Sequence, residues 1–74
     1  MKLQQLSSNH AVITLADGVQ ILFSYETPVA CFAAGEYFRT SKSWRHTTTR
    51  HINSWAHIEA EKPQEYFHKL VEGI

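Results

Sequence analysis

The chain has 74 residues, a single cysteine, and seven basic residues balanced by seven acidic ones, so its formal net charge is zero. A chain of this length forms one small domain, residues 1–74, whose core contributes only roughly 3–5 kcal/mol of net stability. Because Cys31 has no partner in the chain, an internal disulfide is excluded, which argues against a secreted disulfide-rich scaffold and for a reducing compartment. The balanced charge excludes an acidic DNA mimic and a uniformly basic coat for nucleic acid.

The apolar residues are distributed as in a water-soluble protein. No apolar run approaches the roughly 20 residues that span a bilayer, and the first twenty residues lack the apolar centre of a signal peptide. We therefore expect a cytoplasmic protein with no membrane partner. Homo-oligomerisation stays open, because a second subunit is one way to stabilise so small a core.

The first pattern along the chain is a β-hairpin around Asp17-Gly18 within AVITLADGVQILFSY, residues 11–25. A two-residue loop would pair Ala16 with Val19 and leave both faces of the hairpin mixed. A three-residue loop pairs Leu15 with Val19 instead and collects the apolar side chains at alternate positions on one face. Since a slip of one residue reverses every side chain, the three-residue loop is favoured, with Gly18 in the left-handed conformation.

A second hairpin is predicted from residues 28–34, PVACFAA, and 36–40, EYFRT, with Gly35 in the turn between them. Period-two alternation places Tyr37 and Arg39 on one face of the return strand. Cys31 lies among apolar residues and is expected to be a small buried hydrophobe, not a reactive thiolate. Residues 3–6, LQQL, are compatible with a short leading strand.

The C-terminal part has helical periodicity. Thr47, Thr48 and Thr49 are candidate N-caps, and Ile52, Trp55 and Ala56 form an apolar stripe that Glu59 would continue by one turn. Pro63 suits the first position of a second helix over QEYFHKLVEG, with Gly73 as its C-cap. The predicted fold class is α+β. It consists of a small antiparallel β-meander of four strands, or five with the N-terminal one, packed on one or two C-terminal helices that cover a single face.

Motifs of catalysis and metal binding are absent from the sequence. His46, His51 and His57 have unsuitable spacing for zinc, because two histidines six positions apart on a helix diverge by roughly 120°. Three scattered glycines cannot form a phosphate loop, and no nucleophile-elbow pattern accompanies the serines. We expect no metal, no cofactor and no enzymatic activity.

A basic, acid-free window lies between Glu36 and Glu59. Tryptophan and arginine often carry the binding energy of interfaces, and they also stack on or contact single-stranded nucleic acid. The window predicts a partner-binding surface where the last strand meets the helix. A protein partner is favoured, and the alternative is a nucleic-acid-binding module using residues 37–58. Trp44 has a second interpretation, in which its ring folds back and covers the core. The candidate partner-binding residues are Tyr37, Arg39, Lys42, Trp44, Arg45 and Arg50.

Residues 27–55, TPVACFAAGEYFRTSKSWRHTTTRHINSW, resemble the core of small uncharacterised proteins encoded by tailed phages and prophages. The shared pattern is Thr-Pro-Val, an aromatic-Arg-Thr strand end, Lys-x-Trp, and Thr-Thr-x-x-His-Ile-Asn-x-Trp. These motifs fall here at 27–29, 37–40, 42–44 and 48–55. The resemblance implies phage origin, hence the host cytoplasm, and a compact non-enzymatic body. By analogy with other tiny, non-catalytic proteins, we expect an accessory protein that binds a host or phage protein. The resemblance supplies no catalytic residues.

Overall fold

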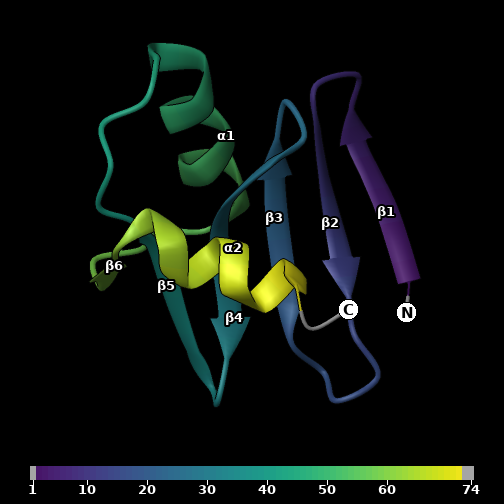
Figure 1. Ribbon diagram of the computed structural model, residues 1–74. Coiled ribbons are helices and arrows are strands. Elements are labelled where there is room, and N and C mark those ends of the chain that lie inside the picture. Colours follow the sequence, from purple (N-terminus) through teal and green to yellow (C-terminus); the bar gives the residue numbers. More distant parts are fainter. Residues whose placement is uncertain (1, 73–74) are drawn as a thin grey trace.

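A computed structural model describes residues 2–72 and shows an α+β fold (Figure 1). Six strands form one sheet in the order in which they occur along the chain, and the neighbours are antiparallel except for β5 and β6. The N-terminal strand is present, and β6 is a short addition that periodicity did not indicate. The elements are β1 (Lys2–Ser7), β2 (His10–Thr14), β3 (Gln20–Ser24), β4 (Thr27–Ala33), β5 (Glu36–Thr40), α1 (His46–Trp55), β6 (Glu61–Lys62) and α2 (Gln64–Glu72).

The β2–β3 hairpin has the predicted three-residue loop. The Leu15 N–H donates to the Val19 carbonyl over 2.8 Å, and Gly18 has a φ of +89°. Further along the ladder, Ile13 faces Ile21. The register was therefore decided correctly by the requirement that one face of the hairpin be apolar.

Two further tight turns use residues other than glycine in the left-handed region. Tyr25 and Glu26 connect β3 to β4 with φ values of +51° and +70°, and Ala34 precedes Gly35 between β4 and β5 with a φ of +54°. Such two-residue turns match the right-handed twist of the paired strands. The backbone thus adopts disfavoured torsions in order to keep the meander tightly connected.

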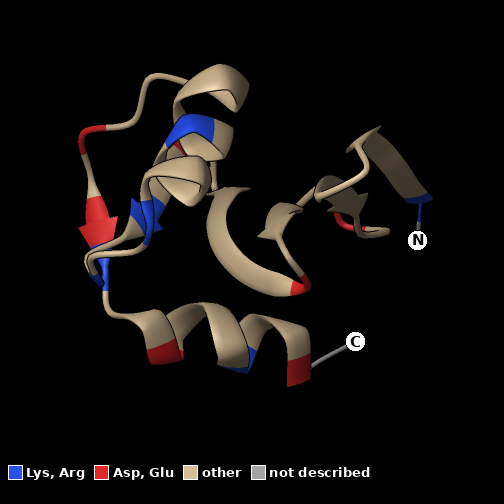
Figure 2. Cartoon of the chain, turned by 90° about the horizontal axis from the view of Figure 1, so that it is seen from above, with Lys and Arg blue, Asp and Glu red and all other residues tan. Residues whose placement is uncertain are grey.

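The two helices lie on opposite faces of the sheet, so the prediction that they cover a single face is wrong (Figure 2). Ile52 of α1 packs in a core cluster with Leu22 and Ala30. On the other face Cys31 is buried, and α2 supplies the fully buried Phe67. Strands β3 and β4 carry buried apolar residues at successive positions, so both of their faces have to be covered.

The first helix begins earlier and ends earlier than predicted. It starts at His46 with Arg45 as the N-cap residue, and no side chain in the described part of the chain caps it. The threonines 47–49 are therefore helical residues and not caps. Thr48 lies on the buried face of α1, where it accepts a hydrogen bond from Ser24. Residues 56–60 leave the helix and run toward β6, so Glu59 adds no further turn. The second helix follows Pro63 as predicted, and Gly73 lies outside the described residues.

Candidate partner-binding surface

The six predicted contact residues come from three neighbouring segments. Tyr37 and Arg39 lie on β5, and Arg50 lies on the exposed side of α1. The connection between β5 and α1 carries the other three, Lys42, Trp44 and Arg45. In Figure 2 basic positions of β5 and α1 lie on the same side of the molecule. We call these six residues the junction surface.

Trp44 packs against the core as well as contributing to the junction surface. Its half-buried ring packs against the core cluster beneath α1, which is the arrangement that the second interpretation of this residue predicted. Its indole N–H donates to Gln64 Oε1 over 3.1 Å. The Lys42 ammonium lies 4.4 Å from the ring centroid, a cation–π contact that places a positive charge beside the tryptophan.

Gln64 holds this part of the structure together, and sequence reasoning missed it. Its Oε1 accepts hydrogen bonds from the Thr40 hydroxyl over 2.7 Å and from Trp44. Its amide nitrogen donates to the Pro28 carbonyl, also over 2.7 Å. One side chain at the start of α2 thereby ties together β4, the end of β5 and the connection. A polar residue directly after Pro63 was the available signal, but its partners are 20 to 36 positions away.

Arg39 is not free of acidic neighbours, although no acid is near it in the sequence. The parallel pairing of β5 with β6 places Glu61 opposite Arg39. Both line a hollow of about 220 Å³ that Lys42 and Trp44 also border. The Arg39 guanidinium donates to Asn53 Oδ1 over 3.4 Å, while its buried Nε has no partner among residues 2–72. Figure 2 shows the acidic position of β6 beside the basic ones.

A second hollow, of about 360 Å³, opens at the N-terminal end of α1. Trp44 and Tyr25 contribute aromatic walls, buried Val29 contributes an apolar surface, and Arg45 contributes an exposed cation. Hydroxyl groups, including that of Thr47, also line it. An apolar side chain that carries a nearby hydrogen-bond acceptor or negative charge matches this lining.

Tyr37 and Arg50 stand apart from that hollow. Tyr37 is 41 % exposed and packs its ring against Phe32 and Trp55, with centroids 4.6 and 5.3 Å away. It borders a shallow depression together with His57 and other residues of the segment that follows α1. The structure therefore brings Arg39, Lys42, Trp44 and Arg45 around two adjoining hollows, and leaves Tyr37 and Arg50 at the margins.

A histidine and hydroxyl cluster lies on the α1 face, and no pattern in the sequence indicated it. The rings of His10 and His51 stack with centroids 4.2 Å apart and planes within 8°. Ser24 donates to Thr48 over 3.1 Å, and its hydroxyl oxygen also lies at hydrogen-bond distance, 2.7 Å, from His51 Nδ1. Burial, and secondarily His10, lower the pKa of His51. Ser24 is only 2 % exposed, and its contact with His51 joins β3 to α1.

The remaining candidate groups for chemistry are also separated or shielded. Burial raises the pKa of the Cys31 thiol, which keeps it protonated. His46 and His57 are exposed and His51 stacks on His10, so the three histidines whose spacing argued against zinc also have different surroundings. Within residues 2–72, no group of three or more histidine, cysteine or acidic side chains is placed to hold a metal ion.

Neither helix in the described part of the chain has the length and apolar character that crossing a membrane requires.

Comparison with known proteins identifies a family. No curated protein and no solved structure matches the chain. A family model does match, over residues 1–69, and this segment contains every strand and the candidate surface. The chain therefore belongs to the family of unknown function DUF8033.

Proposed function

We propose that this chain is a small, non-catalytic accessory protein of the phage type whose junction surface binds a host or phage protein in the host cytoplasm. The observation that carries the proposal is the position of Trp44. Its ring is held by Gln64 on one edge and by Lys42 over its face, and it also forms a wall of the hollow beside Arg45. The resemblance of residues 27–55 to small phage and prophage proteins supports the biological setting.

Preorganisation supports a binding role for this surface. A tryptophan whose ring is already fixed loses little conformational entropy when a partner covers it. Tryptophan and arginine are also the residue types that most often dominate interface energies. Trp44 meets both conditions, and Arg45 supplies the second residue type, at a hollow large enough for a single side chain of the partner.

The charge distribution favours a protein over a nucleic acid. Glu61 lies opposite Arg39, and the chain as a whole has no net charge. Binding to a polyphosphate backbone depends on many uncompensated cations and on the release of their counterions. A surface of mixed charge around an aromatic residue is more typical of a protein interface.

The test begins with affinity capture from host lysate, followed by affinity measurements on the purified partner. We expect Trp44→Ala to weaken binding by about 2 kcal/mol or more, and Arg45→Ala by about 1 kcal/mol or more. Lys69→Ala, an exposed change on α2, is the matched control and should leave affinity unchanged. Each variant is first checked for an intact circular dichroism spectrum, because Trp44 also packs on the core. Unchanged affinity in the folded Trp44 and Arg45 variants would contradict the proposal.

A parallel gel-shift experiment addresses the alternative. If the partner were single- or double-stranded DNA, log affinity would fall linearly with log salt concentration, and each lost phosphate contact would lower the slope by about one. We expect no shift at physiological salt. A shift that weakens on removal of Arg39 and Arg45 would replace the protein partner by a nucleic acid.

A further inference from the structure

The first strand is an exposed sheet edge. In the sheet formed by the described residues, β1 has a neighbour on one side only, which is β2. Its six residues, KLQQLS, include no proline and no charge after Lys2. Edge strands that remain unpaired in solution are usually protected by charges, prolines or short length, because free N–H and C=O groups attract another strand. Apart from Lys2 at its first position, β1 carries no charge and no proline, and with six residues it is not short.

The ladder determines which backbone groups of β1 face outward. The Leu15 N–H bonds to the Val19 carbonyl. Because the backbone N–H and C=O groups of successive residues point to opposite sides of a strand, those of Ile13 and Ala11 also point toward β3. Val12, between them, directs its groups toward β1, where its partner is Gln4. The backbone N–H and C=O groups of the residues flanking Gln4, which are Leu3 and Gln5, therefore point away from the sheet.

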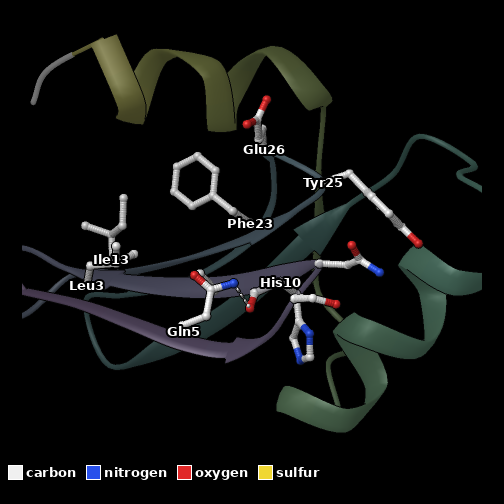
Figure 3. A pocket seen from close by; sticks show the side chains of 10 residues that line it. Leu3, Gln5, His10, Ile13, Phe23, Tyr25 and Glu26 are labelled. Atoms are coloured by element: carbon white, nitrogen blue, oxygen red, sulfur yellow. Dashed lines mark hydrogen bonds between the residues drawn. The ribbon is translucent and has the colours of Figure 1, made fainter.

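An apolar sheet face adjoins this edge. Leu3 is 63 % exposed and lies beside its β2 partner Ile13, and Phe23 extends from β3 on the same face of the sheet, the one that α2 packs against (Figure 3). These side chains line a hollow of about 630 Å³. Among the described residues that line it, Glu26 is the one with a carboxylate, and it lies at the end of the sheet where β1 finishes.

We propose that β1 pairs antiparallel with β1 of a second copy across a two-fold axis perpendicular to the sheet. Leu3 then faces Gln5 of the second copy, and both residues have outward backbone groups. This axis keeps like faces on the same side, so the two Leu3 side chains become diagonal neighbours on the apolar face, within reach of each other across the join. It also brings Lys2 of the second copy to the end of β1 that lies nearer Glu26.

A second copy fits this edge better than an unrelated strand. The pairing is self-complementary, it places the two Lys2 residues at opposite ends, and a chain of zero net charge does not repel its copy. The other edge of the sheet, β6, has two residues and is too short to match β1. Association therefore closes as a dimer and does not extend into a filament.

The first measurement is sedimentation equilibrium on the full chain over a range of concentrations. We expect the mass to rise from 8.5 kDa toward twice that value and no further. Amide exchange measured by NMR should show the Leu3 and Gln5 N–H groups becoming protected as concentration rises. Open-ended association, or a monomer with rapidly exchanging Leu3 and Gln5 amides at every concentration, would overturn the proposal.

Two variants locate the interface. Gln5→Pro removes one outward N–H and no hydrogen bond of the β1–β2 ladder, so the monomer keeps its fold. Leu3→Lys brings two added charges together across the join and leaves the edge backbone unchanged. Both should weaken dimerisation at least tenfold with an unchanged circular dichroism spectrum. Ala60→Lys adds the same charge at an exposed position far from β1 and should have no effect. A dimer that persists in both folded variants would mean that the copies meet elsewhere.

Discussion

Gln64 satisfies its hydrogen-bonding groups with three segments that are distant in sequence. Replacing it with alanine leaves the Thr40 hydroxyl, the Trp44 indole N–H and the Pro28 carbonyl without their partner. We expect Gln64→Ala to lower the free energy of unfolding by about 1–3 kcal/mol, the usual cost of unpaired buried polar groups. Urea denaturation followed by tryptophan fluorescence measures this change. Gln4→Ala, an exposed glutamine on β1, is the control and should stay within about 0.5 kcal/mol.

His51 makes stability depend on pH. Burial and the neighbouring His10 lower its pKa below the ordinary value of about 6.5, so the unfolded chain binds a proton at this site more readily than the folded chain does. Its contribution is fully present above the ordinary pKa and is lost as pH falls toward the lowered one. The other groups around the ring are Ser24, Thr48 and Tyr25, whose ring centroid is 5.7 Å away, and none of them is an acidic residue.

The measurement is the thermal midpoint between about pH 8 and pH 5, compared between the parent chain and His51→Gln. We expect the midpoint to fall more steeply with acid in the parent chain. The exposed His57→Gln serves as the control and should follow the parent. Parallel pH profiles of the parent and His51→Gln would show that the stacked pair is not the acid-sensitive element.

At the scale of single elements, the β4–β5 turn stores strain that a substitution can release. Ala34 has a φ of +54°, a conformation that costs an L-residue roughly 1–2 kcal/mol. Glycine adopts it freely but loses more entropy on folding, so Ala34→Gly should stabilise the protein by up to about 1 kcal/mol. Ala33→Gly, one position earlier in β4, should instead destabilise it by about 0.5–1 kcal/mol. Thermal denaturation compares the two, and a loss of stability in Ala34→Gly would contradict the argument.

Local patterns predicted the strands better than the helix ends. The β2–β3 register followed from the face pattern and Gly18, and Pro63 correctly separated the second helix from the residues before it. The start of α1 was misplaced because several threonines are equally plausible caps. The burial of Thr48 within α1 decides where the helix starts, and its hydrogen-bond partner Ser24 lies 24 positions away, outside any local pattern.

For the whole molecule, the placement of one helix on each face divides the core into two small parts. Phe67 anchors α2 and is fully buried. Phe67→Ala should cost about 3–5 kcal/mol, comparable to the entire net stability of so small a domain, and should leave the chain largely unfolded at 25 °C. Lys69→Ala on the exposed side of the same helix is the control. A cooperative thermal transition close to that of the parent in Phe67→Ala would show that the α1 side alone supports the fold.

The sequence by itself determined the α+β class, the hairpin register, the burial of Cys31 and the tight turn at Gly18. Each of these depends on residues close together in the chain, whose spacing carries the information. Only the tertiary structure decided that the helices lie on opposite faces, that Glu61 stands opposite Arg39, and that Gln64 holds Trp44 in place. Those contacts join segments up to 36 positions apart, and they depend on which sheet face each helix covers. Local periodicity does not encode that choice, because β3 and β4 are apolar on both sides.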